Sequence, residues 1–173
     1  MYDCAECSFV YGDHAIEGIA AELVALGARY ASRLRVPAGA ADREESLRRR
    51  PEPAVWSALE YACHVRDVLL AQRERLFLAL VEDCPSFAPI YPDRRVVLAR
   101  YGSEDPAQVA GELHVAAGLA ARAFAGVEFA DWSRPCFYNY PSPARRSVAW
   151  LAQHTLHEGE HHLLDIDRAT GLS

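Results

Sequence analysis

The sequence lacks long hydrophobic runs, an excess of positive charge and the basic, then apolar, N-terminus of a signal peptide. Polar residues interrupt every apolar run well short of the ~18 residues that a membrane span needs. We therefore expect a cytoplasmic protein with no membrane partner. The formal net charge is −6 over 173 residues, which disfavours binding to nucleic acid or to an anionic membrane.

The five cysteines do not form an even, regularly spaced set, so a disulfide framework is not expected and the thiols should be reduced. Cys4 and Cys7 form a lone C-x-x-C pair, which is half of a zinc site. No second cysteine pair of suitable spacing follows. The pair is either unliganded and weakly redox-active, or part of a zinc knuckle completed by a partner chain or a distant cysteine.

Strand-like alternation is nearly absent, whereas apolar residues recur at helical spacing through most of the chain. This spacing predicts four long helices, and Asp13 and Asp105 are expected to cap two of them. Four helices with two long connections predict an all-α fold, a four-helix bundle, or alternatively an irregular all-α array. We expect a single domain over residues 1–173, with a short cysteine-containing extension at about 1–12. The helices are expected at about 13–34, 53–82, 105–124 and 144–170, with a shorter turn near 94–101.

The last predicted helix carries four of the seven histidines within nine residues. Residues four apart share a face of a helix, so His157 pairs with His161 and Glu158 pairs with His162. A helical wheel places Glu158 and His162 at the margin of the apolar face, and the other pair on the more polar side. We therefore expect Glu158 and His162 to face the core, and His154 and His157 to lie on the surface.

A glutamate and a histidine one turn apart at the edge of an apolar face suit a divalent metal. The alternative is that Glu158 and His162 hydrogen-bond to each other or to a neighbouring helix. A third ligand would come from another helix, where His14, His64 and His114 are the candidates. His64 is favoured because it lies mid-helix beside small residues that leave room for a pocket.

Two other metal motifs match the last helix less well. Residues 157–161 spell H-E-x-x-H, the motif of zinc proteases, but the wheel puts both histidines on the polar side and no third ligand follows. A ferritin-like di-metal site needs two E-x-x-H motifs, and only Glu158-x-x-His161 is present. Both interpretations are therefore disfavoured.

Two segments resemble motifs of the DinB-like/YfiT-like superfamily. Residues 56–67 (Trp-Ser, then His-Val-x-Asp) resemble its second-helix motif, and residues 158–166 resemble its last-helix motif. The similarity covers nearly the whole chain after about residue 13. It implies an up-down-down-up four-helix bundle, often a homodimer, with a nickel or zinc ion bound by His64, Glu158 and His162. Many members have histidine where this chain has Glu158, whereas the mycothiol-dependent maleylpyruvate isomerases have glutamate.

The resemblance also implies a class of reaction. Members with known activity mostly use bacillithiol, mycothiol or glutathione in S-transfer or isomerisation, and a metal with an open position lowers the pKa of a bound thiol. We therefore expect a thiol-dependent transferase or isomerase, with a low-molecular-weight thiol such as mycothiol as co-substrate and a small electrophile as substrate. Asp67 and Asp165 could orient the ligating histidines, or be solvated or ion-paired. The alternative is a non-catalytic metal-binding or stress-related bundle.

Overall fold

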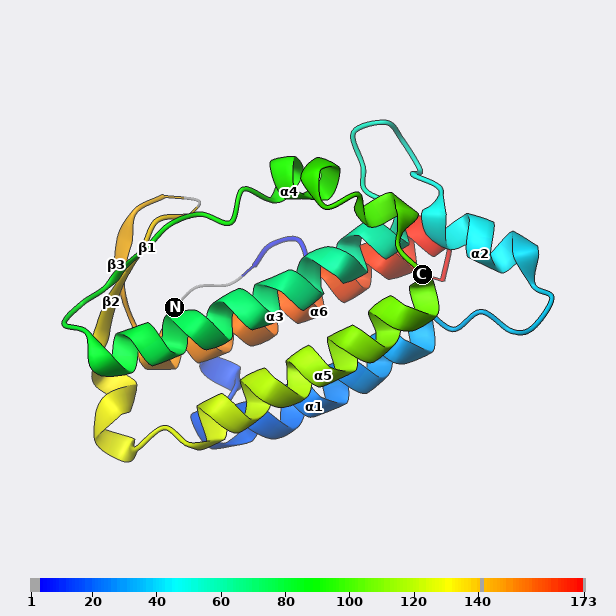
Figure 1. Ribbon diagram of the computed structural model, residues 1–173. Helices are drawn as coiled ribbons and strands as arrows, with labels where there is room; N and C mark the ends of the chain where they lie inside the picture. The colour runs from blue at the N-terminus through cyan, green and yellow to red at the C-terminus, as the bar shows by residue number, and fades with distance from the viewer. Residues whose placement is uncertain (1–3, 141, 173) are drawn as a thin grey trace.

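Four long helices form the body of the protein, as the computed structural model of residues 4–140 and 142–172 shows (Figure 1). Helices α1 and α3 each contact both α5 and α6, so α1 and α3 occupy opposite corners of the bundle. In Figure 1, α1 and α6 run in one direction and α3 and α5 in the other. The predicted four-helix bundle is therefore confirmed. Its helices are α1 (Ile16–Arg33), α3 (Ala58–Val81), α5 (Pro106–Ala125) and α6 (Val148–Thr170).

A small sheet lies at one end of the bundle, and here the all-α prediction was wrong (Figure 1). The sheet contains β1 (Ser86–Phe87), β2 (Pro135–Tyr138) and β3 (Ala144–Ser147), with β1 parallel and β3 antiparallel to β2. Strands of two to four residues are too short to show a period-two pattern. Residues 144–147, expected to begin the last helix, pair with β2 instead, and the Ser147 hydroxyl caps α6 by accepting from the Trp150 N–H.

Helix α3 begins five residues later than predicted, because a capping box fixes its start. The Ser57 hydroxyl accepts from the Glu60 N–H at 3.2 Å, and the Glu60 carboxylate accepts from the Ser57 N–H at 2.8 Å. Arg50 donates to the same carboxylate at 2.7 and 2.8 Å. Burial would raise the pKa of Glu60, but these bonds hold the pKa below its ordinary value. The cap thereby sets the position of every later side chain on α3.

The remaining helix ends follow the predictions in part. The Asp105 carboxylate caps α5 by accepting from the Gln108 N–H at 2.8 Å, as expected. Asp13 does not cap α1, because it lies in a short 3-10 turn and Ala15 precedes the helix. None of the described helices is both long and apolar enough to cross a membrane. The shorter helical elements are η1 (Tyr11–Asp13), α2 (Ala41–Arg48), α4 (Pro92–Leu98), η2 (Tyr101–Ser103) and η3 (Phe129–Ser133).

Helices α1 and α6 approach each other closely at Gly159. The Tyr30 hydroxyl donates to the Gly159 carbonyl at 2.8 Å, and a Cβ atom at position 159 would overlap the buried side chain of Leu26. Only glycine fits this crossing without movement of Leu26. The crossing lies immediately beside Glu158, so it also fixes the depth at which that carboxylate sits.

Replacing Gly159 with alanine should therefore destabilise the bundle. Overpacking lowers the free energy of unfolding by about 1–3 kcal/mol, partly offset by the better helix propensity of alanine, up to about 1 kcal/mol. Urea denaturation measures the difference. Gly111→Ala is the matched control, because a Cβ there meets nothing within 4 Å, and it should be neutral or stabilising. Equal stability of Gly159→Ala and wild type would contradict the close approach.

Candidate metal centre

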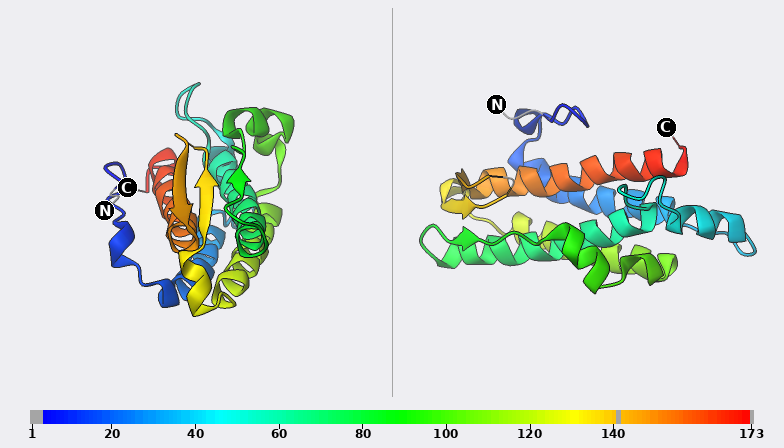
Figure 2. Two further views of the ribbon diagram at one scale, coloured as in Figure 1. Left: turned by 90° about the vertical axis from the view of Figure 1, so that its left-hand side faces the viewer. Right: turned by 90° about the horizontal axis from the view of Figure 1, so that it is seen from above.

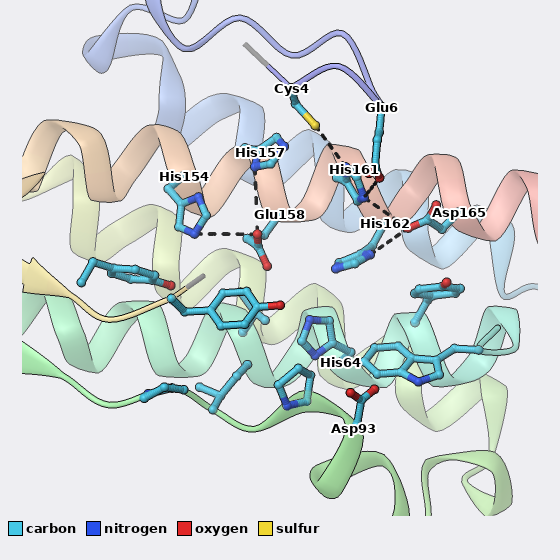
Figure 3. Close-up of a pocket in the computed structure, with 18 of the residues that line it drawn as sticks. Cys4, Glu6, His64, Asp93, His154, His157, Glu158, His161, His162 and Asp165 are labelled. Atoms are coloured by element: carbon cyan, nitrogen blue, oxygen red, sulfur yellow. Dashed lines mark hydrogen bonds and ion pairs between the residues drawn. The ribbon is translucent and has the colours of Figure 1, made fainter. Parts of the chain in front are cut away.

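The structure brings together the three side chains that the sequence analysis selected. His64 comes from α3, and Glu158 and His162 come from α6 (Figure 3). One potential ligand atom of each residue lies within 4.8 Å of the others. The imidazole rings of His64 and His162 stand nearly perpendicular, with centroids 4.9 Å apart. His64, Glu158 and His162 thus form a three-donor cluster between α3 and α6.

His64 is buried with an unsatisfied ring nitrogen. The residue is 4% exposed, and its Nδ1 has no hydrogen-bond partner among the described residues. Burial lowers the pKa of His64 to about 4, so the imidazole is neutral at pH 7. A buried polar atom without a partner is costly, and a neutral imidazole is the form that binds metals. The side chain therefore fits the role of a ligand.

Glu158 lies among imidazoles. Its carboxylate is 3.7 Å from His154 Nε2 and 4.0 Å from His157 Nδ1. Burial alone would raise the pKa of Glu158, but the surrounding histidines, first His154 and His162, lower it below its ordinary value. One carboxylate with two imidazoles is a normal donor set for zinc or nickel. The residues present therefore fit a divalent ion.

The two aspartates that were considered as acceptors have different roles. Asp165 Oδ2 lies 3.0 Å from His162 Nδ1, so this prediction is confirmed, and the contact leaves Nε2 of His162 free to act as a donor to a metal. For Asp67 the alternative, ion pairing, is the one that the structure shows. Its carboxylate accepts from the Tyr101 hydroxyl at 2.6 Å and pairs with Arg66 and Arg95, each at 3.0 Å.

The expectation that His154 and His157 lie on the surface was wrong. His154 is 7% exposed, and the Tyr11 hydroxyl lies 2.8 Å from Nδ1 of His154 and 3.1 Å from Nδ1 of His157. The N-terminal segment, residues 4–14, runs beside α6 (Figure 2), and its Tyr11 contacts both rings. The wheel could not anticipate this, because it describes the pattern of one helix and not what packs on it.

The other histidine candidates lie away from the three-donor cluster. His14 pairs with Glu22 at 2.8 Å, and His114 is exposed on α5. Neither residue belongs to a group of described side chains that could share an ion with His64. Of the three candidates, His64 is therefore the one that the fold places beside Glu158 and His162.

A cavity of about 650 Å³ opens beside the cluster and extends along α3 to Arg75. His64, Val68 and Arg75 share one face of α3, and the eleven residue steps from His64 to Arg75 span about 16 Å along the helix. Arg75 donates to the Tyr138 hydroxyl at 2.8 Å and forms no ion pair within the described part of the chain. Sequence reasoning missed Arg75, although its spacing from His64 was a usable signal.

Comparison with known proteins gives two findings. The sequence model of the DinB superfamily matches residues 26–166. A solved structure resembles the fold with a TM-score of 0.73 at 16% sequence identity, covering 91% of this chain and 89% of that one. That protein is YfiT from Bacillus subtilis, described as a probable metal-dependent hydrolase with an unusual four-helix bundle topology. A search of curated protein sequences found no significant match.

Asp67 should stabilise the protein in a pH-dependent way. Burial would raise its pKa, but hydrogen bonds from Tyr101 and Arg95 hold the pKa below its ordinary value. Its contribution is therefore complete above the unfolded pKa of about 4 and is lost as the pH falls through the lower folded pKa. Asp67→Asn should cost about 1.5–3 kcal/mol at pH 7 and progressively less below pH 4, as urea unfolding at several pH values can measure.

A matched control for this effect is Asp42→Asn, because Asp42 is exposed on α2. It should change the free energy of unfolding little at any pH. A loss in Asp67→Asn that stays constant between pH 7 and pH 3 would show that the aspartate acts through its shape and not through its charge.

His64→Ala should lose one divalent ion per chain relative to the wild type. The variant lacks the one donor that α3 supplies, so Glu158 and His162 alone bind weakly. The measurement is elemental analysis after loading with zinc and gel filtration. His114→Ala, a histidine variant outside the cluster, should keep the wild-type content. Full metal content in His64→Ala would refute the three-donor site.

Proposed function

The chain belongs to the DinB superfamily, and we propose that it is a metal-dependent enzyme that activates a low-molecular-weight thiol toward a small electrophile. Nickel or zinc would be held by His64, Glu158 and His162. One observation carries the proposal: these three donors lie within 4.8 Å of one another and all line the same cavity of about 650 Å³. That volume suits a small-molecule substrate.

Three protein donors leave coordination positions open, as in catalytic zinc sites. A bound ion would supply Lewis acidity, which gives a thiol or a water molecule nucleophilic character at neutral pH. The protein supplies the positioning. Asp165 orients His162, and burial keeps His64 neutral. The rings of Trp56 and Tyr61 pack against the two imidazoles, with centroid distances of 5.2 and 5.3 Å.

Arg75 supports a substrate that carries an anionic group. It lies about three helical turns from His64 at the wall of the cavity, and its charge is not neutralised by an ion pair within the described residues. A guanidinium binds carboxylates well in such a site. The electrophile would therefore reach from the metal centre to Arg75 with a carboxylate at its far end. The protein would then transfer the thiol to this electrophile, or would use the thiol to isomerise the electrophile.

Hydrolysis is the second candidate function. It is favoured by the similarity to YfiT, which is described as a probable metal-dependent hydrolase. The same donors and the same cavity would serve a water nucleophile. A metal-binding role without turnover is the third possibility. Only the first function needs a thiol, and only the first two turn over a substrate, so rates measured with and without a thiol distinguish the three.

The test is to incubate zinc-loaded and nickel-loaded protein with mycothiol or glutathione and a chromogenic electrophile. We expect conjugate formation above the rate without protein, and none above that rate with His64→Ala. Ester hydrolysis without thiol is measured in parallel. Metal-dependent hydrolysis without thiol would favour the second function, and a metal-loaded protein inactive in both assays would favour the third.

Arg75→Met should weaken binding of anionic electrophiles selectively. Loss of a charge-assisted hydrogen bond raises the KM by about 10-fold or more for an unsaturated ketone with a remote carboxylate, with a smaller effect on kcat. The KM for the methyl ester of the same compound should not change. Arg73→Met is the control, because Arg73 pairs with Glu74 outside the cavity. Equal effects on acid and ester would contradict the role of Arg75.

A further inference from the structure

We propose that Cys4, Cys7, His157 and His161 form a second metal site, a structural zinc site separate from His64, Glu158 and His162. One ligand atom of each of the four residues lies within 4.8 Å of the others. The spacings, two residues between the cysteines and three between the histidines, match those of Cys2His2 zinc sites. The two histidines of α6 thus supply the second pair of ligands that the N-terminal C-x-x-C pair lacks.

The two sites use neighbouring rows of the same helix. Successive residues on a helix differ by about 100°, so the row of His157 and His161 faces one way and the row of Glu158 and His162 another. Figure 3 shows His161 directed toward Cys4 and Glu6, and His162 directed toward His64. The N-terminal segment covers the row of His157 and His161, and α3 covers the row of Glu158 and His162. Both rows are therefore enclosed, by different parts of the chain.

The imidazole of His161 is oriented as a ligand. Its Nδ1 lies 3.6 Å from the Sγ atom of Cys4. Its Nε2 lies 3.6 Å from Asp165 and 3.5 Å from Glu6. A histidine that binds zinc through one nitrogen commonly has a carboxylate beside the other, and two carboxylates lie at ion-pair distance from Nε2 of this ring.

The imidazole of His157 offers a matching nitrogen. Its Nδ1 lies 3.1 Å from the Tyr11 hydroxyl. Its Nε2 is buried and has no hydrogen-bond partner among the described residues. A buried nitrogen without a partner is rare in proteins and calls for an ion or a water molecule. Here two thiols and a second imidazole surround the position that such an ion would take.

The backbone of the N-terminal segment presents both thiols. The Ser8 N–H donates to the Cys4 carbonyl at 2.8 Å, and the Cys4 N–H donates to the Phe9 carbonyl at 3.0 Å. This closed turn requires a positive φ of 59° at Ser8 and brings Cys7 back beside Cys4. Both cysteines are free thiols. A thiol is a weak hydrogen-bond donor, so zinc coordination is much the stronger interaction open to the pair.

A zinc ion with four protein ligands has a closed coordination sphere and a structural role. Cys4 and Glu6 line the same cavity as His64, Glu158 and His162. Zinc bound to Cys4 and Cys7 would fasten the N-terminal segment to α6 and so hold one wall of that cavity in place. The ion would shape the cavity and would not activate a substrate.

Metal content distinguishes the two sites. Full-length protein is purified with reductant, loaded with zinc and desalted. We expect two zinc ions per chain in the wild type, one in Cys4→Ser/Cys7→Ser and one in His64→Ala. Cys84→Ser changes a cysteine outside both clusters and should keep two. If the site of His64, Glu158 and His162 binds no metal, the wild type should still contain one zinc ion per chain, and that ion should be absent from Cys4→Ser/Cys7→Ser.

Cobalt substitution tests the ligands directly, because thiolate coordination gives an intense charge-transfer absorption in the near ultraviolet. The band should be present in the wild type and in His64→Ala, and absent in Cys4→Ser/Cys7→Ser. It should be lost or shifted in His161→Gln, which keeps a polar side chain of similar size. Circular dichroism confirms that each variant is folded.

Three results would overturn the second site. The cysteine variant could retain both zinc ions, or the cobalt band could be unchanged in folded His161→Gln. The wild-type protein purified with reductant could also contain a single zinc ion that is lost in His64→Ala. Each result would show that the cysteine pair has a role other than holding zinc with α6.

Discussion

The burial of polar side chains along α6 is the constraint on which the rest of the structure depends. A carboxylate and four imidazoles within nine residues cannot be enclosed without partners. The fold supplies these partners from two directions. Helix α3 contributes His64 to the row of Glu158 and His162, and the N-terminal segment contributes Tyr11 to the row of His157 and His161. Gly159 allows the helix that carries them to approach α1 closely.

The sequence predicted those features that depend on local periodicity. The four long helices and the orientation of Glu158 and His162 toward the interior follow from the spacing of apolar residues within one segment. The short sheet could not be predicted in this way, because its strands pair residues far apart in the chain and are too short to show a pattern. The burial of His154 and His157 depends likewise on a distant segment. Cys4 and His161 lie 157 residues apart, so nothing local links their motifs.

Asp67 and Asp165 show how surroundings decide the role of a residue. Each aspartate lies three residues after a histidine of the proposed metal centre, His64 or His162. The spacing is the same and the helical geometry is the same. Asp165 contacts its histidine and also Arg168 of the same helix, whereas Asp67 bonds to Arg95 and Tyr101 from other elements. The tertiary structure, which places Arg95 and Tyr101 beside Asp67, accounts for the difference.

Asp165 stands between the two rows of α6. Its Oδ2 atom lies 3.0 Å from His162, a hydrogen bond, and 3.6 Å from His161, an ion-pair distance. One carboxylate therefore lies beside one ring of each row, although the two rows face different parts of the chain. Replacing Asp165 would remove a neighbour from both rows at once.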